Sequence, residues 1–169
     1  MTLRTLRRRA LLPLIGAGLV LPLLPLPVRG GEDATDPRAA VVAMVEAACA
    51  ALTEHGFPRG IGRAAPDTWS RLDSGLYVFL MNRAGRLLLH PEGQMEGRDV
   101  SGARDLAGAF FIRNILAACA AHPRGVWTDY LWPDGNAGEA GTKHTYSKVA
   151  ATPDAGDLIA SAGYLATEI

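Results

Sequence analysis

Hydrophobic and polar positions follow two different periods along the chain, and the longer period predicts a helix near residue 40. Asp36 followed by Pro37 has the form of an N-cap acid before a proline at the first helical position. Gly56, Phe57 and Pro58 should end the helix near His55. Between these limits apolar residues recur at the spacing of one helical face, at Val41, Met44, Val45, Ala48, Cys49 and Leu52.

Shorter apolar runs bounded by turn residues predict five strands. Residues 76–81 and 86–90 flank a turn at 82–85 and predict a hairpin. Three further strands are predicted at 126–132, 142–150 and 158–165. Their connections are too short for crossover helices, so these strands should be antiparallel neighbours.

A second helix is predicted at 106–121, with Ile112, Leu116 and Cys119 on one side. The Gly- and Pro-rich residues 56–75 and the polar residues 91–104 predict irregular connections. The order is then helix, two strands, helix, three strands. This order predicts an α+β domain, in which one antiparallel sheet carries both helices against one face.

The first thirty residues differ from the rest in composition. They hold five arginines and no acid, and an uncharged stretch runs from Ala10 to Val28. This layout predicts a cleavable signal peptide over 1–30, a mature domain over 31–169 and a periplasmic location. Arg8 and Arg9 partly match the twin-arginine export pattern, so that route and the general secretory route both stay open. The alternative is a retained membrane helix, which Pro22, Pro25 and Pro27 would break.

The charge balance changes when the leader is set aside. The whole chain has 17 basic and 17 acidic residues, and without the five leader arginines 12 basic residues remain against the 17 acids. An acidic domain of this kind lacks the basic face of a nucleic-acid-binding protein. Cys49 and Cys119 form either a disulfide in the periplasm or two separate buried thiols, and the strict geometry of a bridge favours separate thiols. No spacing predicts a zinc site, a haem site or another cofactor.

Five segments of the chain match, in the same order, the sequence motifs of one known family. They are residues 77–82 with Gly85 and 89–91, residues 97–100, the segment Gly-Val-Trp-Thr-Asp-Tyr-Leu-Trp-Pro at 125–133, residues 143–148 and residues 160–165. Together they resemble the single Cache domain, an extracytoplasmic sensor module with a PAS-like fold, over roughly residues 38–168. Within the matched segments Val126 is inserted after Gly125, and the loop before residue 142 is rich in glycine where the family usually has a Lys or Glu.

The resemblance implies a ligand pocket between the sheet and its helices, and a small organic acid as the ligand. Members of the family usually precede a kinase or chemoreceptor region. This sequence ends at Ile169 without such a region. We therefore expect a membrane receptor or histidine kinase as partner, and no nucleic acid.

The candidate ligand-binding residues supply a cation, aromatic rings and hydroxyl groups, which suit a carboxylate in a partly apolar pocket. His144, Tyr146 and Lys148 share one face of their strand because side chains alternate. The whole set is Phe110, Arg113, Trp127, Tyr130, His144, Tyr146 and Lys148. The alternatives are a solvated Lys148, a solvated Arg113 and ordinary packing of the aromatic residues.

The sequence thus predicts a periplasmic module that senses or carries a small carboxylate. A second hypothesis is a structural or interaction domain whose pocket is filled by its own side chains, such as Trp127 and Phe110. An enzyme is disfavoured because the sequence contains no G-x-S-x-G, H-E-x-x-H or P-loop motif.

Overall fold

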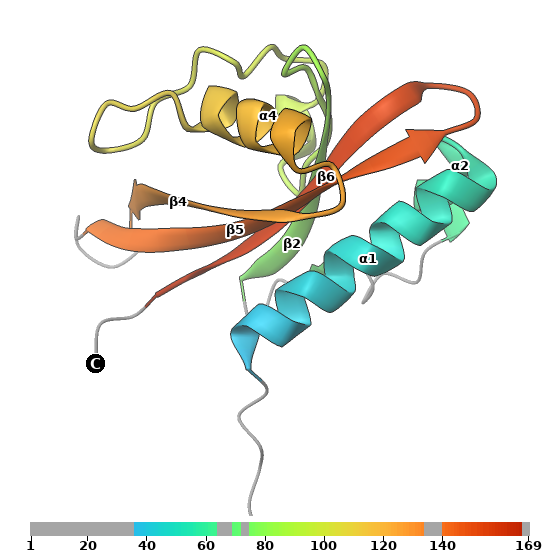
Figure 1. Ribbon diagram of the computed structural model, residues 1–169. Helices are drawn as coiled ribbons and strands as arrows, with labels where there is room; N and C mark the ends of the chain where they lie inside the picture. Colours follow the sequence, from blue (N-terminus) through green and yellow to red (C-terminus); the bar gives the residue numbers. More distant parts are fainter. Residues whose placement is uncertain (1–35, 64–68, 72–74, 134–139, 167–169) are drawn as a thin grey trace, which may run out of the picture. The chain divides into compact units, whose positions relative to one another are not determined.

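The computed structural model of the protein describes residues 36–63, 69–71, 75–133 and 140–166 (Figure 1). The predicted signal peptide at 1–30 lies outside these residues, as does the middle of the predicted turn before residue 142. Within the described ranges no helix is both long enough and apolar enough to cross a membrane.

The first helix, α1 (Pro37–His55), forms where the sequence predicts it. The carboxylate of Asp36 accepts a hydrogen bond from the backbone N–H of Arg38 at 3.0 Å, which satisfies one free donor of the first turn. At the other end Gly56 has a φ of 72°, a conformation that a side chain would strain. The six residues of the predicted apolar face are the buried residues of the helix.

The strands form one antiparallel sheet in the order β1-β2-β6-β5-β4, with β3 paired to β2. They are β1 (Ser70–Arg71), β2 (Leu76–Asn82), β3 (Leu87–Leu89), β4 (Val126–Pro133), β5 (Ala140–Thr152) and β6 (Gly156–Leu165). The predicted hairpin and the antiparallel neighbours are confirmed. The structure adds a short strand, β1, to the five that the sequence predicts.

The expectation of an irregular connection over 56–75 is only partly correct, because it also holds the short helix α2 (Arg59–Arg63). This helix lies close against α1: a Cβ on Gly60 would be 2.8 Å from the carbonyl oxygen of Ala51. Tertiary packing of this kind leaves no local periodicity for the sequence to show. A 3-10 turn, η2 (Gly93–Met95), similarly interrupts the loop predicted at 91–104.

The second long helix, α4 (Phe111–Ala121), starts five residues later than predicted. Asp105 explains the difference, because its carboxylate accepts hydrogen bonds from the N–H of Ala109 at 2.8 Å and of Leu131 at 3.2 Å. The N–H of Leu106 also donates to the carbonyl of Leu131 at 3.1 Å. The backbone at 105–109 is therefore tied to the edge of β4 instead of continuing the helix.

The two long helices pack on opposite faces of the sheet, which corrects the expectation of one covered face (Figure 1). Val78 and Leu80 of β2 pack with α1, whereas Phe79 and Met81 of the same strand pack with α4. Side chains alternate along a strand, so β2 contributes to two separate cores. We call these the α1 core and the α4 core.

The two cysteines lie in different cores. Cys49 belongs to the α1 core and Cys119 to the α4 core, and both are buried free thiols. Burial raises the pKa of Cys49 to about 12 and that of Cys119 to about 11. The prediction of two separate buried thiols is thus confirmed, since the sheet stands between them.

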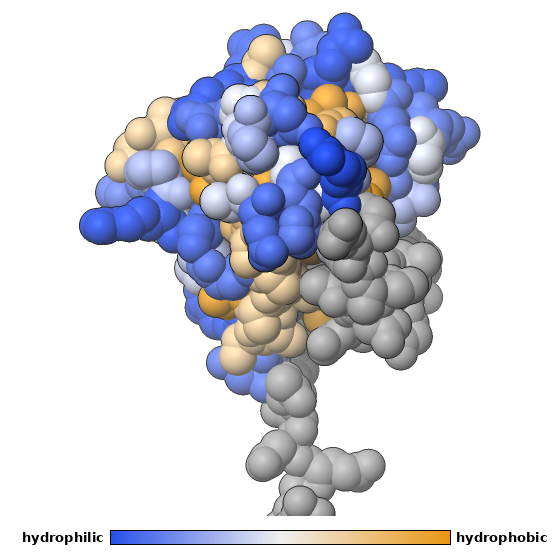
Figure 2. All heavy atoms as spheres, turned by 90° about the vertical axis from the view of Figure 1, so that its right-hand side faces the viewer, coloured by the Kyte–Doolittle hydropathy of each residue, from blue (hydrophilic) through white to orange (hydrophobic). Residues whose placement is uncertain are grey.

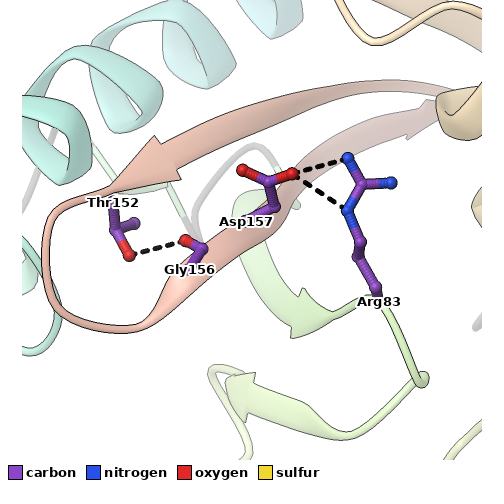
Figure 3. Close-up of polar contacts among 4 residues, drawn as sticks. All are labelled: Arg83, Thr152, Gly156 and Asp157. Atoms are coloured by element: carbon purple, nitrogen blue, oxygen red, sulfur yellow. Dashed lines mark hydrogen bonds and ion pairs between the residues drawn. The ribbon is translucent and has the colours of Figure 1, made fainter.

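Polar contacts close the turns at one end of the sheet (Figure 3). The hydroxyl of Thr152 donates to the carbonyl of Gly156 at 2.6 Å, across the turn between β5 and β6. Arg83, in the turn of the first hairpin, donates twice to Oδ2 of Asp157, at 3.1 and 2.8 Å. Such exposed pairs add little stability, so these contacts mainly fix the turn geometry. Figure 2 shows the molecule from the right-hand side of Figure 1, and hydrophilic residues predominate on the described part of this face.

Candidate ligand-binding site

A cavity of about 160 Å³ lies on the α4 side of the sheet. Strands β2 to β5, helix α4 and the loop before it all contribute to its wall. The apolar part of the wall is formed by Phe79, Leu87, Met95, Val100, Phe111 and Ile112. The polar and aromatic part is formed by Tyr77, His90, Arg104, Tyr130, Trp132 and Lys143. A mostly apolar pocket with a few convergent polar groups is typical of a small-molecule site.

Lys143 supplies a buried cation to this wall. It projects from the cavity-facing side of β5 and is only 8% exposed. Its Nζ lies 5.0 Å from the ring centre of Tyr77 and 5.7 Å from that of Trp132. Among the described residues no carboxylate lies within ion-pair distance of it. Burial lowers the pKa of Lys143, because an ammonium group loses its hydration there.

Tyr130 supplies a hydroxyl directed by its neighbour. Its ring stacks on Phe111 at 4.5 Å, and its oxygen accepts a hydrogen bond from the hydroxyl of Thr145 at 3.1 Å. The phenol's own proton is therefore left for another acceptor. Burial raises the pKa of Tyr130 to about 12, so the hydroxyl stays protonated at neutral pH.

His90 completes the polar groups near Lys143. Its Nδ1 accepts a hydrogen bond from the N–H of Glu92 at 3.1 Å, and its ring meets that of Tyr77 edge-on at 5.3 Å. Burial lowers the pKa of His90. The neutral ring with Nδ1 as acceptor carries its proton on Nε2, which makes Nε2 a donor.

Arg104 reaches the cavity from the loop before α4, and a stack of side chains holds it there. Its guanidinium lies 3.7 Å from the ring centre of Phe110 and donates to the carbonyl of Gly108 at 2.5 Å. Arg113 lies 4.3 Å from the same ring and donates from Nε to the carbonyl of Ser101. The predicted site residues Phe110 and Arg113 thus support this loop and do not line the cavity.

Tyr146 and Lys148, also predicted as site residues, face α1 instead. Nζ of Lys148 lies 2.5 Å from Oε2 of Glu46, and the hydroxyl of Tyr146 donates to Oε1 of the same carboxylate at 3.4 Å. Glu46 raises the pKa of Lys148 by accepting this hydrogen bond. This cation is therefore already paired, on the side of the sheet opposite the cavity.

Trp127 and His144 lie on the same side as Lys148. His144 Nδ1 is 2.8 Å from Oδ1 of Asp129, while the ring of Trp127 lies 5.4 Å from that of Tyr146 and carries the guanidinium of Arg38 at 4.5 Å. Of the seven predicted site residues, the structure places only Tyr130 in the cavity wall.

On β5 the residue that lines the cavity, Lys143, differs from the predicted residues of that strand by the parity of its position. Alternation groups His144, Tyr146 and Lys148 correctly, but it does not show which face meets the pocket. Lys143 is the β5 residue in the cavity wall, and it pairs directly with Tyr130 of β4. The sequence does not show this register, because the connection between β4 and β5 does not fix how the two strands pair.

The described residues do not gather three or more His, Cys, Asp or Glu side chains in an arrangement suited to a metal ion. The polar groups of the cavity wall are instead the buried amine of Lys143, the guanidinium of Arg104, hydroxyl groups and an imidazole. These are donors, and they suit a ligand that carries acceptor oxygens.

Comparison with known proteins places the fold. In three of the similar solved structures the alignment covers most of both chains. A periplasmic sensor domain of a chemotaxis protein has a TM-score of 0.53 and 24% identity, covering 77% of this chain and 90% of the other. A Cache chemosensory domain described for carboxylic acid recognition has a TM-score of 0.59 and 18% identity, covering 76% and 92%. A methyl-accepting chemotaxis protein from Vibrio parahaemolyticus RIMD 2210633 has 0.55 and 16%, covering 75% and 87%.

No curated protein matches the chain. The model of the family Single Cache domain 2, in contrast, matches residues 46–154. This match covers more than half of the sequence and includes strands β1 to β5, helix α4 and the cavity wall, whereas β6 lies beyond it. The α+β architecture predicted from the sequence agrees with it. The chain therefore belongs to the single Cache domain 2 family, whose domains are sensor modules.

Proposed function

We propose that this domain is an extracytoplasmic sensor that binds a small carboxylate in the cavity on the α4 side. The single observation that carries the proposal is Lys143, a cation 8% exposed at the cavity wall with no acidic partner among the described residues. An unpaired buried ion costs several kcal/mol. A ligand carboxylate would complete the pair and take a further hydrogen bond from Tyr130.

The size and lining of the cavity define the ligand more closely. A cavity of about 160 Å³ is close to the volume of an engineered cavity that admits benzene. Charged and hydroxyl groups converge near Lys143, while Phe79, Phe111 and Ile112 make other parts of the wall apolar. A short monocarboxylate with an apolar tail fits both features. The similar domain described for carboxylic acid recognition supports this class of ligand.

The two lysines of β5 provide the test. Short monocarboxylates are added one by one, and the unfolding temperature of the wild-type protein is measured. A ligand that binds should raise the free energy of unfolding by about 2.7 kcal/mol at a hundred times its Kd. Lys143→Met should abolish the shift. The matched control, Lys148→Met, removes a lysine from the same strand but from the opposite face, and should keep the shift.

The reverse pattern would place the ligand on the α1 side, where Lys148, Tyr146 and Glu46 meet. A well-folded wild-type protein that responds to none of the acids would refute carboxylate binding. An alternative role as a structural domain without a ligand predicts a cavity filled by Trp127 and Phe110. The structure favours the sensor, since neither residue lines the cavity.

We also propose that residues 1–30 act as the export signal and that the ligand state is passed to a receptor or histidine kinase. The chemotaxis proteins among the similar structures support a signalling partner of this kind. Reconstitution with a candidate kinase would test it: added ligand should change the kinase rate only when this domain is present.

A further inference from the structure

The chain contains only two lysines, Lys143 and Lys148, and the structure gives them opposite environments. Lys148 is partly exposed and is bonded to Glu46, which raises its pKa. Lys143 faces the cavity, is 8% exposed and has no carboxylate within ion-pair distance among the described residues. One amine is thus paired with a carboxylate, and the other is buried without one among the described residues.

A desolvated amine in an apolar pocket is the arrangement that makes a lysine nucleophilic toward carbonyl groups. We propose that Nζ of Lys143 captures small aldehydes in this cavity as an imine. The inference uses the cavity of the proposed function, but it requires the neutral amine where carboxylate binding requires the cation. The ligand class is a short aldehyde whose apolar chain occupies the same wall.

The step balances without a cofactor. The lone pair of Nζ attacks the carbonyl carbon and forms a C–N bond, while the carbonyl oxygen gains a proton and the nitrogen loses one. The C–O bond of the carbinolamine then breaks, its hydroxyl group leaves as water with the remaining N–H proton, and the C=N bond forms. One aldehyde and one amine give one imine and one water, so nothing is oxidised or reduced.

The residues around Lys143 match the needs of this step. Tyr130 receives a hydrogen bond from Thr145 at 3.1 Å, so its own proton is free to serve the carbonyl oxygen. The apolar wall, including Phe111 and Ile112, limits the water that would reverse the reaction.

Burial and the neighbouring rings act on Lys143 in opposite directions. Burial lowers its pKa and so increases the neutral fraction. The ring centres of Tyr77 and Trp132 lie 5.0 and 5.7 Å from Nζ and attract the ammonium form. Both separations lie within the range of about 6 Å over which a ring attracts a cation, so the reaction draws on the neutral fraction that burial produces.

The experiment is reductive trapping on the full chain with butanal and sodium cyanoborohydride near neutral pH, followed by peptide mapping. We expect a butyl group to form faster on Lys143 than on Lys148, because Glu46 holds Nζ of Lys148 in an ion pair and Nζ of Lys143 has no such partner among the described residues. Mapping separates the chain's terminal amine from both lysines. Added butanoate should protect Lys143, and Lys143→Arg should remove the label at that position.

Equal labelling of the two lysines, or an unlabelled Lys143 in excess butanal, would overturn the inference. The wild-type map needs no variant, so a misfolded variant cannot obscure the result. The two proposals fail in different ways. A thermal shift with butanoate but no label at Lys143 refutes imine capture alone, whereas a label at Lys143 without any carboxylate shift refutes carboxylate sensing alone.

Discussion

At the scale of single residues, the position of a side chain on β5 decides its chemistry. Lys143 and Lys148 are five positions apart, so alternation sends them to opposite faces. The sequence correctly predicts which residues of this strand share a face. It does not predict which face meets the cavity, because that depends on how the strand pairs with β4 and on where α1 and α4 pack. For this reason the sequence points to Lys148 as the candidate cation, whereas the structure places Lys143 in the cavity wall.

Carboxylate binding at Lys143 should weaken as the pH rises. Burial lowers the pKa of Lys143 in the free protein, and a bound carboxylate would raise it again. The affinity for the carboxylate is then greatest at pH values below the pKa of Lys143 in the free protein. Above that pKa the affinity falls by about tenfold per pH unit, until the pH reaches the pKa of Lys143 in the complex. Titration calorimetry with butanoate across this range measures the effect.

The control for this pH dependence is Lys143→Arg, since arginine stays protonated throughout the range. Whatever affinity the arginine variant retains should not change with pH. A wild-type Kd that is equally flat would show that the lysine does not titrate during binding.

At the scale of elements, the segment before α4 shows how a single side chain can override periodicity. Apolar residues from Leu106 onward continue the helical pattern, and so the sequence predicts a helix start at 106. The carboxylate of Asp105 instead binds the backbone N–H groups of Ala109 and Leu131. Elements with strong local patterns, such as α1 and β2, were predicted closely. The short α2 and β1 depend on packing against α1 and β2, and local sequence does not show them.

Replacing Asp105 should loosen this segment without disturbing the far side of the sheet. Asp105→Ala removes both hydrogen bonds, and we expect a loss of about 1–3 kcal/mol in the free energy of unfolding. Urea denaturation measures that loss. Hydrogen exchange should speed up at the amides of Ala109 and Leu131 while the amides of α1 keep their protection.

Asp105→Asn is the matched variant, because its single side-chain oxygen can still accept from one of the two amides. It should lose less stability than Asp105→Ala. Equal exchange rates at Leu131 in the alanine variant and the wild type would show that the carboxylate does not hold the segment to β4.

At the scale of the whole molecule, a long helix packs on each face of the sheet, and β2 is buried on both sides. A continuous apolar run in β2, from Leu76 to Met81, is the pattern of a strand covered on both faces. That signal was present in the sequence, but the order of elements favoured helices on a single face. Two cores follow from it, with Cys49 in one and Cys119 in the other.

The separation of the cores predicts how the thiols react. Exported protein that is denatured without reductant and treated with iodoacetamide should take up two alkyl groups, because the sheet keeps the cysteines apart. Intact-mass measurement counts them, and the same spectrum shows whether residues 1–30 have been removed, as the sequence predicts. Uptake of no alkyl group until a reductant is added would indicate a disulfide.

The sharing of β5 between the cavity and α1 has a consequence for any protein that holds this domain. Lys143 lies in the cavity wall on one side of the strand, and Lys148 forms an ion pair with Glu46 of α1 on the other. Suppose that a ligand in the cavity changes the affinity of a partner protein for α1. Thermodynamic linkage then requires the partner to change the affinity of the domain for the ligand by the same factor. The sensitivity of the sensor is then a property of the assembly, and the isolated domain would report a different threshold concentration from the one set in the cell envelope.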